Sequence, residues 1–131
     1  MRRVPLFLAI IMFAGCGAIT AVKPDAMAGT YVLQTFSGRT LPTVHQDGFT
    51  ITAGSMVLNS DATFVFSETT ANGRPDQRNG HGTDVILGSY TVSGTSFALR
   101  VDATTPGTGT VFNGVLTLTS QDGVRTFSLT K

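Results

Sequence analysis

Histidine, serine and threonine are the residues of this chain that could perform acid–base or nucleophilic chemistry. His45 and His81 are the two imidazoles, and each begins a short polar run typical of a solvated turn. They lack the i, i+4 spacing of a helical zinc-binding pair and have no neighbouring cysteine. Serine is abundant, but no Gly-X-Ser-X-Gly motif and no phosphate-binding glycine loop occurs. We therefore expect no catalytic residue, no metal site, no cofactor and no enzymatic activity.

Two polar segments could recognise a partner instead. Residues 37–48 and residues 71–84 are both rich in Gly, Asp, Arg and hydroxyl side chains. The second is longer than the usual hairpin connection and contains Arg74, Arg78 and Asp84. Long loops at one end of a rigid sheet often carry recognition. The alternative is a flexible, charge-balanced connection on the surface.

The single cysteine, Cys16, follows a segment with the layout of a secretory signal peptide. Arg2 and Arg3 precede an apolar run over residues 4–14, and small residues follow it. The run is too short to span a hydrocarbon layer of about 30 Å, although an uncleaved anchor running on to Val22 is an alternative. Residues 13–16, Phe-Ala-Gly-Cys, resemble the lipobox of bacterial lipoproteins. In that family the cysteine becomes the first mature residue and carries the lipid.

This resemblance implies a signal peptide at residues 1–15 and lipidation of Cys16. Residues 16–28 would then tether the lipid to the domain, since Lys23-Pro24-Asp25 disfavours regular structure there. The lipid would attach the protein to a membrane of the bacterial cell envelope, on the periplasmic or outer-membrane face. Gly17 in place of Asp after the cysteine implies, by resemblance to enteric lipoproteins, no inner-membrane retention signal. A plain signal peptide with a buried or free cysteine is the alternative.

Composition limits the rest of the chain to one folded domain. The 131 residues are 41% hydrophobic and 13% charged, which excludes a disordered chain, and one cysteine excludes a disulfide scaffold. Loss of Arg2 and Arg3 with residues 1–15 would leave 7 basic and 8 acidic residues, a net charge of −1. We therefore expect no nucleic-acid partner.

From Thr30 onward, apolar residues alternate with Thr, Ser and Gly, the period-two pattern of half-buried strands. Asn113-Gly114 and Asp122-Gly123 are hairpin signals, so neighbouring strands should be antiparallel. A sheet with one wet face must cover the other, as a sandwich or as a closed barrel. The expected strands lie near residues 30–36, 49–52, 55–59, 63–68, 85–92, 96–102, 108–112, 115–119 and 124–130.

The inward positions of these strands carry large apolar side chains and two phenol hydroxyls. They suit a small hydrophobic ligand with one or two polar anchors. They would equally fill a solid core, as small barrels often do. The candidate ligand-binding residues are Tyr31, Met56, Phe64, Phe66, Tyr90, Phe97 and Leu99.

Four stretches carry a resemblance to a known family: Gly29-Thr30-Tyr31, the hairpin at residues 56–64, the run at residues 88–94 and the ending at residues 127–131. With them, residues 29–131 resemble small bacterial lipocalin-like lipoproteins. The resemblance implies an all-β fold, an antiparallel up-and-down barrel of about eight strands. Tyr31 would take the place of the lipocalin tryptophan. Arg125 would then lie across its ring in a cation–π contact.

We accordingly expect a membrane-anchored lipoprotein whose barrel binds a small hydrophobic or amphipathic ligand without catalysis. The alternative is an envelope interaction module or periplasmic inhibitor, with residues 37–48 and 71–84 surrounding a solid barrel. No feature of the sequence identifies a protein partner. A cavity of several hundred cubic ångströms, open at one end, would favour ligand binding.

Overall fold

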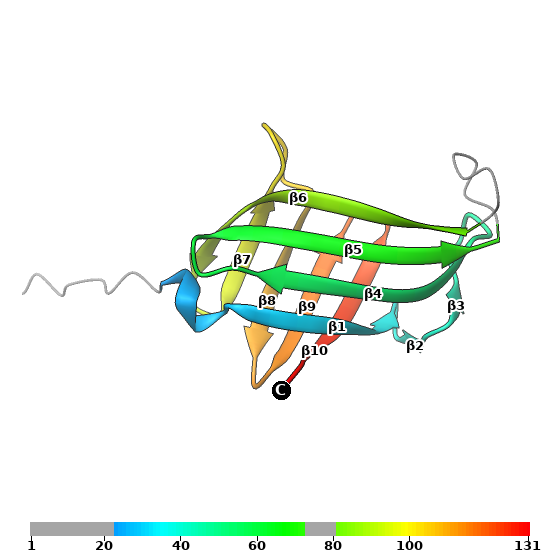
Figure 1. Ribbon diagram of the computed structural model, residues 1–131, viewed down its shortest axis with the longest axis horizontal. Coiled ribbons are helices and arrows are strands. Elements are labelled where there is room, and N and C mark those ends of the chain that lie inside the picture. Colours follow the sequence, from blue (N-terminus) through cyan, green and yellow to red (C-terminus); the bar gives the residue numbers. More distant parts are fainter. Residues whose placement is uncertain (1–22, 73–80) are drawn as a thin grey trace, which may run out of the picture.

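The predicted alternation of apolar and hydroxyl residues produces a closed antiparallel barrel (Figure 1). The structure is a computed structural model that describes residues 23–72 and 81–131. Within that part of the chain, eight strands form the wall: β1 (Gly29–Phe36), β4 (Thr50–Leu58), β5 (Thr63–Ala71), β6 (His81–Ser93), β7 (Ser96–Arg100), β8 (Gly107–Phe112), β9 (Val115–Ser120) and β10 (Gly123–Leu129). From β4 to β10 each strand pairs with the next, and β1 pairs with both β10 and β4 to close the barrel. The expected fold is confirmed.

Local backbone chemistry explains the up-and-down order. Asn113 and Gly114 join β8 to β9 with φ values of 49° and 74°, the positive angles that a tight hairpin turn requires. The β4–β5 turn is held by Asp61, whose carboxylate accepts the Thr63 N–H at 3.0 Å. Each hairpin sets the register of its two strands, so the apolar positions of all strands face the same interior.

Three segments differ from the expected strands. Residues 49–52 and 55–59 belong to one strand, β4, with a register shift between Ile51 and Ala53. Residues 37–48 contain two short strands, β2 (Arg39–Thr40) and β3 (Thr43–Val44). The polar segment at residues 71–84 is shorter than expected, because β5 reaches Ala71 and β6 starts at His81. Residues 73–80 lie outside the described part of the chain.

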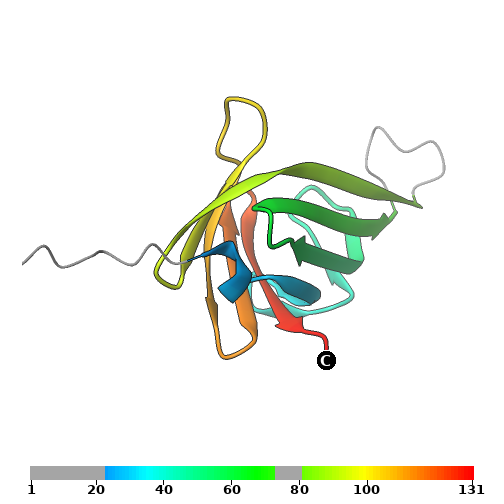
Figure 2. The ribbon, with the colours of Figure 1, turned by 60° about the vertical axis from the view of Figure 1, so that its left-hand side comes forward.

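One end of the barrel, here called the closed end, is where β1, β5, β7 and β9 begin. A short 3-10 helix, η1 (Pro24–Ala26), leads into β1 there (Figure 2). The Tyr31 hydroxyl donates to Met27 O at 2.8 Å, and the Tyr90 hydroxyl donates to Asn59 O at 2.6 Å. Burial raises the pKa of both tyrosines. Met27 is buried too, so the last residues of the expected tether pack onto the barrel.

Side chains fill most of the interior. The buried apolar residues are Met27, Tyr31, Leu33, Phe36, Phe49, Ile51, Met56, Leu58, Phe64, Tyr90, Phe97, Leu99, Leu116, Leu118 and Phe127. Two rings lie over glycines on the neighbouring strand: Phe64 pairs with Gly88, and Phe97 pairs with Gly109. An added Cβ at Gly88 would lie 2.7 Å from Phe64 Cε1, so the ring occupies the space that the glycine leaves.

Candidate functional site

The opposite end of the barrel, here called the mouth, contains a pocket of about 360 Å³. The mouth is where β1, β5, β7 and β9 finish, and the pocket lies beside the ends of β7 and β9 and reaches along β5 from Glu68 to Phe64. Its apolar lining consists of Phe64, Phe66, Ile86, Leu99, Pro106 and Leu118, and its polar lining of Glu68, Asp84, Ser120, Gln121, Asp122 and Arg125. This mouth pocket therefore combines an apolar wall with a small set of polar groups, the usual makeup of a small-molecule site.

Arg125 is the centre of the polar wall and is only 4% exposed. Its Nε donates to Glu68 Oε2 at 2.7 Å, and its Nη2 lies 3.3 Å from Glu68 Oε1. On the other side, Nη1 donates to Asp122 Oδ1 at 2.9 Å and Nη2 to Asp122 Oδ2 at 2.8 Å. A planar guanidinium is suited to two such bidentate contacts, which fix its orientation.

These contacts shift the pKa values of Asp122 and Arg125. Hydrogen bonds from Arg125 hold the pKa of Asp122 well below its usual range. Burial by itself would lower the pKa of Arg125, but the hydrogen bonds and charges of Asp122 and Glu68 outweigh it and raise that pKa. Asp122 and Arg125 are therefore both ionised at neutral pH.

Two aromatic rings flank the guanidinium. Its carbon lies 4.8 Å from the centroid of Phe36 and 5.6 Å from that of Phe66, both within cation–π range. The expectation that Arg125 lies across Tyr31 is wrong. In the β1–β10 register Arg125 is opposite Phe36, whereas Tyr31 is opposite Leu129 near the closed end.

His45 belongs to the same cluster, and the expectation of a solvated turn is wrong for it. It is 3% exposed and stacks on Phe49 with ring centroids 4.3 Å apart. Its Nδ1 accepts the Asp47 N–H at 3.2 Å, and its Nε2 lies 3.7 Å from Asp122 Oδ2. The pairing of β3 with β4 places residues 43 and 45 on the inner side, which a local pattern cannot predict. The side chain of His81 is outside the described part of the chain.

The candidate ligand-binding residues are divided between three places. Phe64, Phe66 and Leu99 line the mouth pocket. Tyr31, Met56 and Tyr90 are packed in the core nearer the closed end. Phe97 is buried beneath a groove on the outside of the barrel.

None of the charged members of the pocket was among the candidate ligand-binding residues, although Arg125 was expected beside Tyr31 and Asp84 was part of the polar segment at residues 71–84. In β5, Glu68 follows Phe64 and Phe66 at the same two-residue spacing, and in β10 Arg125 precedes Phe127. A charged residue at an inward position needs a partner, because burial of an isolated charge is costly. That interruption of the apolar pattern is the signal that could have identified the Arg125–Glu68 pair.

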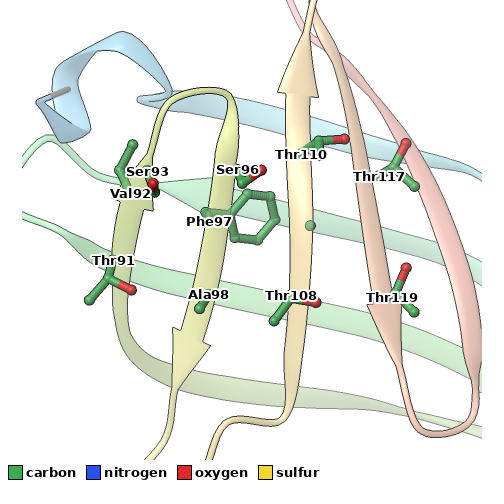
Figure 3. A pocket seen from close by; sticks show the side chains of 11 residues that line it. Thr91, Val92, Ser93, Ser96, Phe97, Ala98, Thr108, Thr110, Thr117 and Thr119 are labelled. Atoms are coloured by element: carbon green, nitrogen blue, oxygen red, sulfur yellow. The ribbon is translucent and has the colours of Figure 1, made fainter.

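The outer groove has a volume of about 510 Å³ and runs over β6 to β9 (Figure 3). Figure 3 shows Thr108 and Thr110 on β8 beside Thr117 and Thr119 on β9. Of the residues that the structure describes, no charged side chain lines this groove. Most of its lining residues are Thr or Ser, and Val92, Phe97 and Ala98 form its apolar part. The mouth pocket has six apolar lining residues together with charged groups and is therefore the better candidate for a ligand site.

Other kinds of site receive no support from the described residues. Among residues 23–72 and 81–131, no group of three His, Cys, Asp or Glu side chains is placed to hold a metal ion. The same residues include no helix of the length and hydrophobicity needed to cross a membrane. No protein-family model, curated protein or solved structure matches the chain. The function must therefore be inferred from the site.

Proposed function

We propose that this protein binds a small hydrophobic or amphipathic molecule in the mouth pocket, without catalysis. The observation that carries the proposal is the pocket itself. Its volume of about 360 Å³ falls within the range of roughly 300–1,000 Å³ that small-molecule sites occupy. Because the closed end is filled by core side chains, the ligand would have to fit within the mouth.

The arrangement of the lining supports an amphipathic ligand. Phe64, Ile86 and Leu118 offer apolar surface, while Ser120 and Gln121 offer hydrogen-bonding groups. The guanidinium of Arg125 is already held by two carboxylates and so acts as a rigid part of the wall. A wall fixed before binding reduces the entropy cost of ordering the site. We propose that the apolar part of the ligand enters first, with its polar part at the rim.

Filling the pocket should abolish binding. Ile86 lines the pocket and is 39% exposed, so a Trp there can occupy the cavity without repacking the core. We expect Ile86→Trp to weaken binding of the neutral apolar dye N-phenyl-1-naphthylamine at least about tenfold, a change of roughly 1.4 kcal/mol. Fluorescence titration of the dye measures this.

The matched control is Val124→Trp. Val124 is 38% exposed and does not line the pocket, so its replacement adds the same indole at a similarly exposed position elsewhere. We expect dye affinity to be unchanged in this variant. Equal dye affinities in Ile86→Trp and in the parent chain would place the dye outside the mouth pocket and refute the proposed site.

We further propose that the protein is a lipoprotein of the bacterial cell envelope, anchored through a lipid on Cys16. The lipobox-like residues 13–16 after an apolar run support this proposal. The anchor would hold the closed end toward the membrane, since Cys16 precedes η1, and would leave the mouth accessible to ligand.

Replacing the cysteine should release the protein. We expect Cys16→Ser, expressed as the full chain in bacterial cells, to move from the membrane fraction to the soluble fraction, because the lipid supplies the attachment. Fractionation followed by immunoblotting measures this. Ser60→Ala, in an exposed turn, should remain with the membranes. Retention of Cys16→Ser in the membrane fraction would contradict lipid anchoring at this residue.

A further inference from the structure

The first half of β6 has a strand on only one side. Residues 81–89 pair with β5, but pairing with β7 begins at Ser89. Among the described residues, no strand pairs with the other side of residues 82–88, here called the open edge. In Figures 1 and 2 the connection from β7 to β8 projects beyond β6 near the middle of that strand. Unpaired strand edges are templates for pairing with another chain.

The hydrogen-bond pattern shows which groups point outward from the open edge. The Tyr90 N–H donates to Ala62 O at 2.8 Å, on the side of β5. Backbone groups of successive residues in a strand point to alternate sides. The N–H and C=O groups of Thr83, Val85 and Leu87 are therefore directed away from β5, toward the open edge.

The side chains of the open edge are unusually apolar for solvent-facing positions. Val85 is 58% exposed and Leu87 is 64% exposed, among the most exposed large apolar residues described. Charged residues, proline or a bulge commonly protect such edges. The open edge contains one charged residue, Asp84, but residues 85–87 are Val-Ile-Leu in regular pairing with β5. An edge with free backbone groups and apolar side chains favours strand addition.

We propose that a second copy of this chain pairs with the open edge, β6 against β6 and antiparallel, about a two-fold axis at Val85. The segment from Gly82 to Gly88 is centred on Val85. In this register Val85 lies opposite its copy and Thr83 lies opposite Leu87. The outward-directed groups of these three residues then meet one another across the axis as hydrogen-bonded pairs.

The side chains select a copy of the chain and this register. Asp84 lies opposite Ile86, so no like charges meet, whereas an axis one residue earlier would place Asp84 opposite Asp84. Gly82 and Gly88 lie opposite each other at the two ends of the segment, and the new pairing stops there because Ser89 already pairs with Arg100 of β7. Since Asp84 and Ile86 also line the mouth pocket, the second copy would border the ligand site.

A cysteine on the axis tests this arrangement in the full chain. Directly opposite residues of a hydrogen-bonded antiparallel pair have Cα atoms about 5.5 Å apart, within the range that a disulfide bridges. We expect Val85→Cys to yield mostly a disulfide-linked dimer on non-reducing gels after mild oxidation of cells. Val44→Cys is the control, because Val44 is also 58% exposed. Both variants and the parent chain contain Cys16, so any cross-linking through that residue is common to all three. Val44→Cys should yield no dimer above the parent level.

A second variant tests association without a cross-link. The full chain purified in detergent should be a dimer by light scattering, and Val85→Lys should be a monomer, since two ammonium groups would meet at the axis. Val44→Lys should remain a dimer. A monomeric parent chain, or equal cross-linking of Val85→Cys and Val44→Cys, would overturn the proposal. The dye titration is a separate measurement, so a monomeric parent chain that still binds the dye would overturn the dimer and leave the pocket proposal standing.

Discussion

Replacing Arg125 with Met should lower the free energy of unfolding at pH 7 by about 3–5 kcal/mol, the usual cost of removing one partner from a buried ion pair. The Met side chain fills much of the space between Phe36 and Phe66 but brings no charge. The carboxylates of Glu68 and Asp122, now on either side of Arg125, would lose the cation between them. Urea denaturation followed by circular dichroism measures the change.

The control and the pH dependence make this prediction specific. Arg100→Met removes an exposed arginine and should change stability by less than about 0.5 kcal/mol. Because the pKa of Asp122 is depressed in the folded state, its stabilising contribution is present above the ordinary carboxyl pKa of about 3.9 and is lost as the pH falls below it. The difference between Arg125→Met and the parent chain should therefore narrow below about pH 4. A difference that is small at pH 7 would contradict the structural role of the cluster.

Adding one methyl group at Gly88 should destabilise the barrel by about 2–3 kcal/mol, at the upper part of the usual range for overpacking. An Ala Cβ there would contact the Arg100 carbonyl oxygen and lie 2.7 Å from Phe64 Cε1. Backbone strain is not the cause, since the φ of Gly88 is outside the left-handed range. Thermal or urea unfolding of Gly88→Ala measures the loss.

Two further variants separate crowding from a general effect on β6. Ser89→Ala, at the next and exposed position, should stay within about 0.5 kcal/mol of the parent. Shortening the ring partner should restore part of the loss, so Gly88→Ala with Phe64→Leu should lose less than the sum of the two single variants. Additive losses in the double variant would mean that the ring does not occupy the space over Gly88.

Much of the barrel could be predicted from local sequence. Asn113-Gly114 and the alternation in β7, β9 and β10 depend on neighbouring residues alone, so the hairpins and their inward faces followed from them. The end of β5 and the start of β6 could not be predicted in this way, because Glu68, Thr70 and Asp84 place polar side chains at inward positions. A run of polar residues predicts a loop when the strand that pairs with it is unknown.

The mouth pocket depended on contacts between segments far apart in the chain. Arg125 meets Glu68 across 57 residues, and the β1–β10 register places it beside Phe36. His45 is buried because the β3–β4 pairing brings its ring against Phe36 and Phe49. No local spacing encodes these encounters. The apolar wall was easier, since Phe64, Phe66 and Leu99 lie at regular inward positions.

Native mass spectrometry of the protein purified from its own host tests ligand binding most directly. The parent chain should carry a small molecule that dissociates on collisional activation, and Ile86→Trp, prepared in parallel, should carry none. Val124→Trp should retain it. A parent chain that is free of any co-purifying molecule in every growth condition, and that also fails to bind N-phenyl-1-naphthylamine, would contradict the account and leave the barrel as a scaffold for protein contacts.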